Sequence, residues 1–229
     1  MKKGKKLHGN KETVVKVCNW LSLPLQALGC CILYLVIEAF SRHSLASAWS
    51  YMVESPWVFL YNAFLIFTTF MVVYLFRRRV LVRLVMSCFW LLLGIINGVI
   101  LANRVTPFTG PDLRNLSDGA KVVTKYLSKG TMILVAAALV ALLAFFVWVW
   151  IKGPKFQGKI RWYLNVPLIA LVIVLFTGAT NLALAKRVLS SYFVNIAFAY
   201  QDYGYPYCLA VTLFDTGISE PNGYSEQLV

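Results

Sequence analysis

Charged side chains that could do chemistry gather at two places in the chain. Glu38 and Arg42 are four residues apart, a spacing that allows an ion pair along one face of a helix. Asp112 is the centre of the second group, and four cations flank it along the chain: Arg104, Arg114, Lys121 and Lys125. We expect these cations to attract the headgroup of an anionic lipid. Glu38, Arg42 and Asp112 are candidate organisers of that site. For Glu38 and Arg42, an ion pair that only anchors the helix end is the favoured interpretation.

Residues suited to catalysis or metal binding do not form a recognisable pattern. The two histidines, His8 and His43, are far apart, and no Cys-x-x-Cys pair occurs. Four of the five cysteines fall in or beside apolar runs, and Cys208 is expected to be exposed, so no disulfide is predicted. The sequence therefore predicts no catalytic residue, no metal ligand and no cofactor in this chain.

The elements that must position the charged groups are long apolar runs. Of the 229 residues 59% are hydrophobic and 14% are charged, and the mean hydropathy is +0.69. A helix needs about 20 apolar residues to cross a bilayer. Five stretches reach that length without a charge: 17–37, 57–76, 84–102, 131–151 and 162–185. We predict an all-α fold, a polytopic membrane bundle of five transmembrane helices. An interfacial amphipathic helix and a short extracellular tail complete it.

The charges between the runs predict the orientation. The tail 1–16, the tight turn with Arg77, Arg78, Arg79 and Arg83, and the loop 152–161 together carry 14 basic residues and one acid. The other connections carry 8 of each sign. Cytoplasmic loops hold the basic excess of a membrane protein, so we place the amino terminus in the cytoplasm and residues 186–229 outside the cell membrane. The net charge of +13 is thereby explained, and nucleic-acid binding loses its support.

A smaller helix is expected in the connection after the third run. Five apolar side chains at 3,4 spacing define one face of residues 112–129: Leu113, Leu116, Ala120, Val123 and Leu127. Gly110-Pro111-Asp112 is a plausible start. The cations of the other face suit a helix in the outer interface near phosphatidylglycerol. Packing on the protein's own outer segment is the alternative.

Small and polar residues inside the runs indicate helix contacts. Gly94, Gly98 and Ala102 recur every four residues, which allows close approach of another helix. Asn62 and Asn97 are amides within apolar runs, and we expect them to make interhelical hydrogen bonds. A substrate path is the less favoured interpretation.

Three stretches resemble the lipoteichoic acid synthase family. They are Asn103-Arg104-Val105-Thr106-Pro107 with Asp112-Leu113, the outer segment from Tyr200 through Cys208 to Glu226, and Glu38-Ala39-Phe40-Ser41-Arg42. The resemblance covers the chain from about residue 20 to its end. It implies the membrane part of a phosphoglycerol transferase that takes glycerol phosphate from phosphatidylglycerol at the outer leaflet.

In that family the chemistry belongs to a sulfatase-like domain with a threonine nucleophile and a divalent metal, usually manganese. The resemblance would place this domain after Val229, so we expect the present chain to hold the anchoring part alone, as a fragment or a split protein. The alternative is a non-enzymatic membrane protein, either a partner subunit or a small transporter.

Overall fold

The computed structural model describes residues 22–115, 129–154, 156 and 160–214, and this part of the chain contains helices and no strand. The side chains of most residues from 129 to 139 are outside the described set. The predicted all-α class is confirmed for these residues.

Four of the described helical segments are long and apolar enough to cross a membrane. They are α2 (Ser22–Ser41), α4 (Pro56–Phe70) with its 3-10 continuation η1 (Met71–Leu75), α5 (Arg79–Leu101) and α9 (Trp162–Ala185). They match four of the five predicted runs, because a run of apolar side chains must keep its backbone hydrogen bonds inside one helix. Length and composition thus support a membrane protein.

The fifth predicted run lies within α8 (Lys129–Lys152), a helix of 24 residues. Its apolar part with described side chains is limited to Val140–Lys152, so the count of five spans stays a prediction. Helix α6 (Gly110–Arg114) begins at the predicted Gly-Pro-Asp start. Most of the expected amphipathic helix 112–129 lies among residues that the structure does not describe.

Helix α5 begins earlier than the apolar run it contains. Arg79 and Arg83, predicted to lie in the tight turn, form the first turns of α5 instead. Arginine favours helices, and both guanidinium groups find partners along the bundle. The Arg79 guanidinium lies 3.8 Å from the centre of the Phe156 ring, and Arg83 donates to Gln26. The turn before α5 is correspondingly short.

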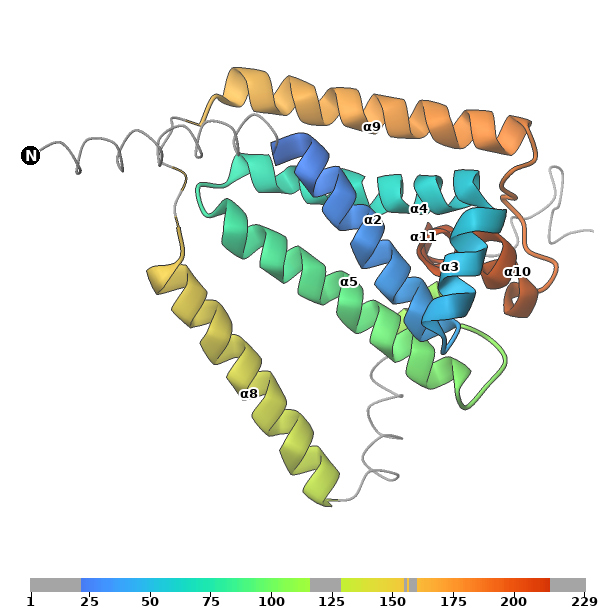
Figure 1. Ribbon diagram of the computed structural model, residues 1–229, viewed down its shortest axis with the longest axis horizontal. Helices are drawn as coiled ribbons and strands as arrows, with labels where there is room; N and C mark the ends of the chain where they lie inside the picture. Colours follow the sequence, from blue (N-terminus) through green and yellow to red (C-terminus); the bar gives the residue numbers. More distant parts are fainter. Residues whose placement is uncertain (1–21, 116–128, 155, 157–159, 215–229) are drawn as a thin grey trace, which may run out of the picture.

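The centre of the bundle is formed by α2, α4 and α5, as Figure 1 shows. The predicted small-residue stripe lies in its tightest contact: a Cβ added to Gly98 would stand 2.8 Å from the backbone oxygen of Phe40, and one added to Gly94 would stand 3.1 Å from Ile37. The close approach of α2 and α5 is confirmed. Helix α9 contacts α4 and η1 and leaves most of its side chains exposed, and α8 contacts α5.

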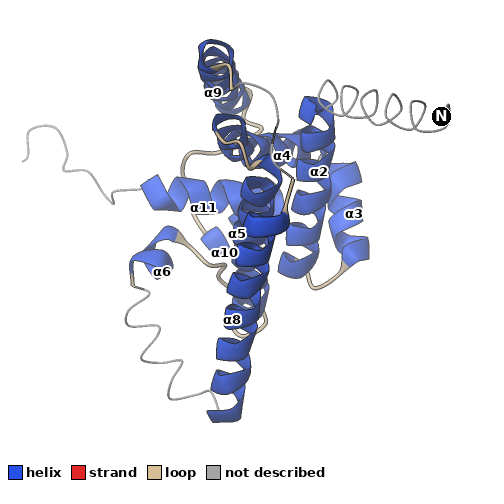
Figure 2. Cartoon of the chain, turned by 90° about the vertical axis from the view of Figure 1, so that its left-hand side faces the viewer, coloured by secondary structure: helices blue, strands red, loops and turns tan. Residues whose placement is uncertain are grey.

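The segment after α9 folds back onto the bundle. Two helices, α10 (Ile196–Tyr203) and α11 (Tyr205–Phe214), form a hairpin at the end of the bundle where α2 and α5 finish. Helix α3 (Leu45–Glu54) lies at the same end, on the opposite side of the bundle from α11 (Figure 2). We call this the Glu38 end, and the other the Arg79 end. The expected tail is thus packed structure as far as Phe214, and Cys208, expected to be exposed, is 1% exposed.

Candidate functional site: a buried polar cluster at the Glu38 end

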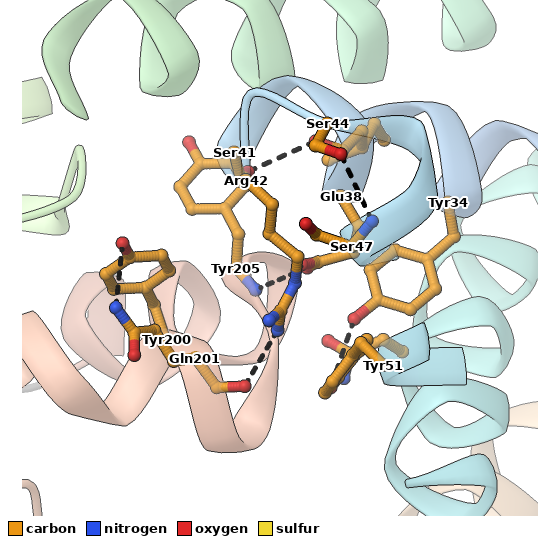
Figure 3. Close-up of polar contacts among 12 residues, drawn as sticks. Tyr34, Glu38, Ser41, Arg42, Ser44, Ser47, Tyr51, Tyr200, Gln201 and Tyr205 are labelled. Atoms are coloured by element: carbon orange, nitrogen blue, oxygen red, sulfur yellow. Dashed lines mark hydrogen bonds and ion pairs between the residues drawn. The ribbon is translucent and has the colours of Figure 1, made fainter. Parts of the chain in front are cut away.

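Glu38 is the centre of the cluster. It lies in the last turn of α2, and its side chain is fully buried. Its Oε2 accepts from Nε of Arg42 at 3.0 Å, and its Oε1 accepts from the backbone N–H of Tyr205 at 3.0 Å (Figure 3). The predicted ion pair is confirmed, and it is part of a longer chain of contacts. A buried carboxylate needs such partners because an unpaired charge is costly away from water.

Arg42, just after α2, connects that helix to the hairpin. Its Nη2 donates to the backbone oxygen of Gln201 at 2.7 Å, and its guanidinium lies 4.0 Å from the centre of the Tyr51 ring of α3 (Figure 3). Burial raises the pKa of the Tyr51 hydroxyl above its usual value, and nearby Glu38 adds to the effect. Glu38 in the last turn of α2 and Arg42 just after it therefore hold α3, α10 and α11 together.

Asn62 holds the same hairpin from α4. Its Nδ2 donates to the backbone oxygens of Val58 and Tyr203, and its Oδ1 accepts from the backbone N–H of Tyr207 at 2.9 Å. Gly204, between α10 and α11, has a φ of +80°. A Cβ there would collide with Asn62 and with the Tyr34 hydroxyl. Only glycine fits this turn comfortably.

Asn97 joins α5 to α2 and to the loop after α5. Its Nδ2 donates to Oγ of Ser41 at 2.9 Å, and its Oδ1 accepts from the backbone N–H of Phe108 at 2.8 Å. Both amides, Asn62 and Asn97, are fully buried. The predicted interhelical bonding is confirmed for Asn97, whereas Asn62 bonds mainly to a hairpin that the sequence did not predict.

Arg104 and Asp112 form an ion pair in the loop after α5. Arg104 also donates to the backbone oxygens of Thr106 and Pro107, and Asp112 accepts from the backbone and the hydroxyl of Thr109. Burial acts to raise the pKa of Asp112, but the bonds from Arg104 and Thr109 outweigh it and hold that pKa below its usual value of 3.8. Asp112 thus holds this loop in place, with Thr109 in a helix-capping arrangement. Its predicted role as an organiser of lipid contacts stays a prediction.

Helix α11 connects this loop to Glu38. The backbone N–H of Gly110 donates to Oγ1 of Thr212 at 3.0 Å, and Arg114 donates to the backbone oxygen of Leu213 at 3.2 Å. A Cβ on Gly110 would collide with the Thr212 backbone. The structure thus brings the described members of both predicted groups to one end of the bundle, with Glu38 near the start of α11 and Arg114 near its end.

Two predicted lipid contacts, Lys121 and Lys125, lie outside the described residues. Arg104 keeps 42% of its side chain exposed. It borders a hollow of about 420 Å³ that is also lined by Asn103 and Tyr200. Residues that the sequence analysis missed are Ser41, Gly204, Tyr205 and Thr212. The glycine before Tyr-Pro was the available signal for a turn.

The cluster is suited to binding and positioning. Its buried carboxylate and amides are used in hydrogen bonds between elements. Within the described ranges, no group of three or more His, Cys, Asp or Glu side chains gathers. The arrangement can hold a hairpin against membrane helices and present Arg104 beside a hollow.

Comparison with models of protein families, with curated proteins and with solved structures gave no match to this chain.

Proposed function

We propose that this chain is the membrane-anchoring domain of a lipoteichoic-acid-synthase-like phosphoglycerol transferase that acts on phosphatidylglycerol at the outer leaflet. The chemistry would be supplied by a sulfatase-like domain, on the same polypeptide or on a separate chain, and a divalent metal would bind there. The resemblance of residues 38–42, 103–113 and 200–226 to that family motivates the proposal.

The observation that carries the anchoring role is the attachment of the α10–α11 hairpin. Glu38, Arg42 and Asn62 bind three backbone sites of the hairpin, at Gln201, Tyr203 and Tyr205, from two apolar helices. An anchor has to fix the position of the segment that follows it relative to the bilayer. A hairpin held by hydrogen bonds does this better than a free tail, and the bonds of Glu38 and Arg42 are strengthened by charge.

A lipid-presenting role is supported by the surroundings of Arg104. Arg104, which is paired with Asp112 and still partly exposed, and Asn103 line a hollow in which a glycerol phosphate headgroup could compete for the guanidinium. An apolar groove of about 740 Å³ between α4, α5, α9 and α11 offers space for acyl chains. A fifth crossing by α8 would put the hairpin outside, on the side where phosphatidylglycerol would be used.

The transporter alternative gains no support from the described residues. A transporter should direct polar side chains into a shared cavity near the bilayer midplane. Glu38, Asn62 and Asn97 bond to protein groups instead.

Two experiments test the proposal. The reading frame that follows Val229 and its neighbouring genes should encode a sulfatase-like domain with a threonine nucleophile. A stop codon with no such domain nearby would favour the partner-subunit alternative.

In cells that make the protein, Arg104→Gln should lower phosphatidylglycerol turnover about tenfold, the cost of one lost bond to a charged group. Lys186→Gln, which removes an exposed cation at the same end, should leave turnover unchanged. Unchanged turnover in both variants, at normal protein levels, would remove lipid presentation and leave anchoring only.

A further inference from the structure

The Arg79 end of the bundle holds a second group of polar side chains, which the proposed function does not use. Arg79 and Arg83 are one helical turn apart on α5, and Ser22 and Gln26 are one turn apart on α2. Arg83 Nε donates to Gln26 Oε1 at 3.2 Å, and the Ser22 hydroxyl lies 3.2 Å from the Tyr74 hydroxyl. Side chains of α2, η1 and α5 therefore meet at one place.

The aromatic ring of Tyr74 supports both guanidinium groups. Its centre lies 5.1 Å from the Arg79 guanidinium carbon and 6.0 Å from that of Arg83. Arg79 also lies over Phe156. Contact with a ring uses the flat face of a guanidinium and leaves its N–H edge able to donate.

Several donors of this group have no acceptor. Gln26 is 6% exposed, and its Nε2 is buried without a hydrogen-bond partner, as are Nε of Arg79 and Nη2 of Arg83. Such groups are rare in folded proteins, and an ion or water molecule is a common reason for them. Arg79 and Arg83 are each partly exposed, so a ligand can approach this group from the surface.

No acidic residue in the described part of the chain forms an ion pair with Arg79 or Arg83. The acids described there are Glu38, Glu54, Asp112 and Asp202, all on elements of the Glu38 end, and both ion pairs of the described residues lie at that end too. The first turn of α5 is also without a side-chain cap, so its backbone adds partial positive charge. The group therefore lacks hydrogen-bond acceptors and negative charge, and an anion would supply both.

We propose that Arg79, Arg83 and Gln26 form a binding site for a phosphate group. Two guanidinium groups and an amide match its oxygens, since arginine binds phosphate through paired N–H donors. The ends of three apolar spans meet there, at the level where lipid headgroups lie. The phosphate of an anionic phospholipid therefore fits this position, and free inorganic phosphate carries the same chemistry. The site is at the opposite end from Arg104 and does not depend on the proposed function.

Binding to the purified protein in nonionic detergent tests the site. Dioctanoyl phosphatidylglycerol, inorganic phosphate and dioctanoylglycerol, which has the same tails without phosphate, are titrated while the melting temperature is followed. We expect phosphatidylglycerol to bind and dioctanoylglycerol not to bind. Arg79→Gln with Arg83→Gln should weaken phosphatidylglycerol binding by tenfold or more, whereas Arg77→Gln, which removes an exposed cation next to the site, should leave it unchanged.

Gln26→Met is a second test of the site, for use if the double variant does not fold. It keeps both cations and the side-chain volume, and it should weaken binding about tenfold through loss of one donor. Arg104→Gln should leave this component of binding intact, which separates the site from the lipid role proposed above. Strong binding of inorganic phosphate would identify the free ion as a ligand. Weak binding of inorganic phosphate, together with strong binding of phosphatidylglycerol, would identify the lipid as the ligand. Equal binding to wild type, the double variant and Gln26→Met, or equal binding of dioctanoylglycerol, would overturn the proposal.

Discussion

At the scale of single residues, Glu38 joins the end of α2 to Arg42 and to the start of α11. Its carboxylate accepts from Arg42 and from the Tyr205 backbone, and removal of one member of a buried charged group leaves the others unpaired. Glu38→Ala should therefore lower the free energy of unfolding by about 3 kcal/mol. Thermal unfolding in detergent measures this. Glu54→Ala removes an exposed acid from the end of α3 and should change little. Equal losses would show that the Glu38 contacts do not stabilise the fold.

Asp112 gives a pH-dependent prediction. Bonds from Arg104 and Thr109 hold its folded-state pKa below 3.8, so its contribution is fully present above the unfolded pKa and is lost as the pH falls through the lower folded value. Asp112→Asn should cost about 1 kcal/mol near neutral pH, typical of a lost helix cap. The difference in melting temperature between wild type and variant should shrink below about pH 3.8. A difference that stays constant into acid would contradict this assignment.

At the scale of the elements, the turn of the α10–α11 hairpin depends on Gly204. Its positive φ and its contact with Asn62 both oppose a side chain, so Gly204→Ala should destabilise the hairpin by about 2 kcal/mol or more. Limited proteolysis after α9 reports detachment of the hairpin. Gly178→Ala in α9 meets nothing within 4 Å and should be neutral or slightly stabilising. A hairpin that resists protease equally in both variants would argue against tight docking.

The contact between α2 and α5 makes a similar prediction. Gly98→Ala would bring a Cβ to 2.8 Å from the Phe40 backbone, so the helices must separate and the melting temperature should fall. Gly29→Ala, with open space around it, serves as the control. Equal melting temperatures would show that α2 and α5 do not need this close approach.

The elements also show what could be predicted from the sequence. The apolar runs, the Gly94–Gly98 contact and the Glu38–Arg42 pair follow from local spacing. The structure contains the contact, the ion pair and four of the five runs as candidate spans. The hairpin does not follow from local spacing, because it is held by the bond from Tyr205 to Glu38, across 167 residues, and by the bonds of Asn62. A Tyr-, Gly- and Pro-rich segment gives no periodic pattern that would indicate such docking. The first turns of α5 were missed because arginines resemble a loop when hydropathy alone is considered.

At the scale of the whole molecule, we predict that α8 crosses the membrane. With a cytoplasmic amino terminus, α8 then puts Lys152 at its end on the cytoplasmic side, and α9 returns Lys186 to the outside. Single cysteines at these positions, in a protein whose native cysteines are replaced, test this with a membrane-impermeant maleimide. We expect Lys186→Cys to react in intact cells and Lys152→Cys to react only after permeabilisation. The reverse pattern, or reaction of both in intact cells, would contradict the predicted topology.

In the proposed function, this bundle serves the transfer of glycerol phosphate from phosphatidylglycerol. The most direct measurement follows radiolabelled phosphatidylglycerol in cells with and without the gene for this chain. We expect deletion to slow conversion of the label to diacylglycerol and to remove the glycerol phosphate polymer. The restored gene should reverse both effects. Unchanged conversion and unchanged polymer in the deleted cells would contradict the proposed function.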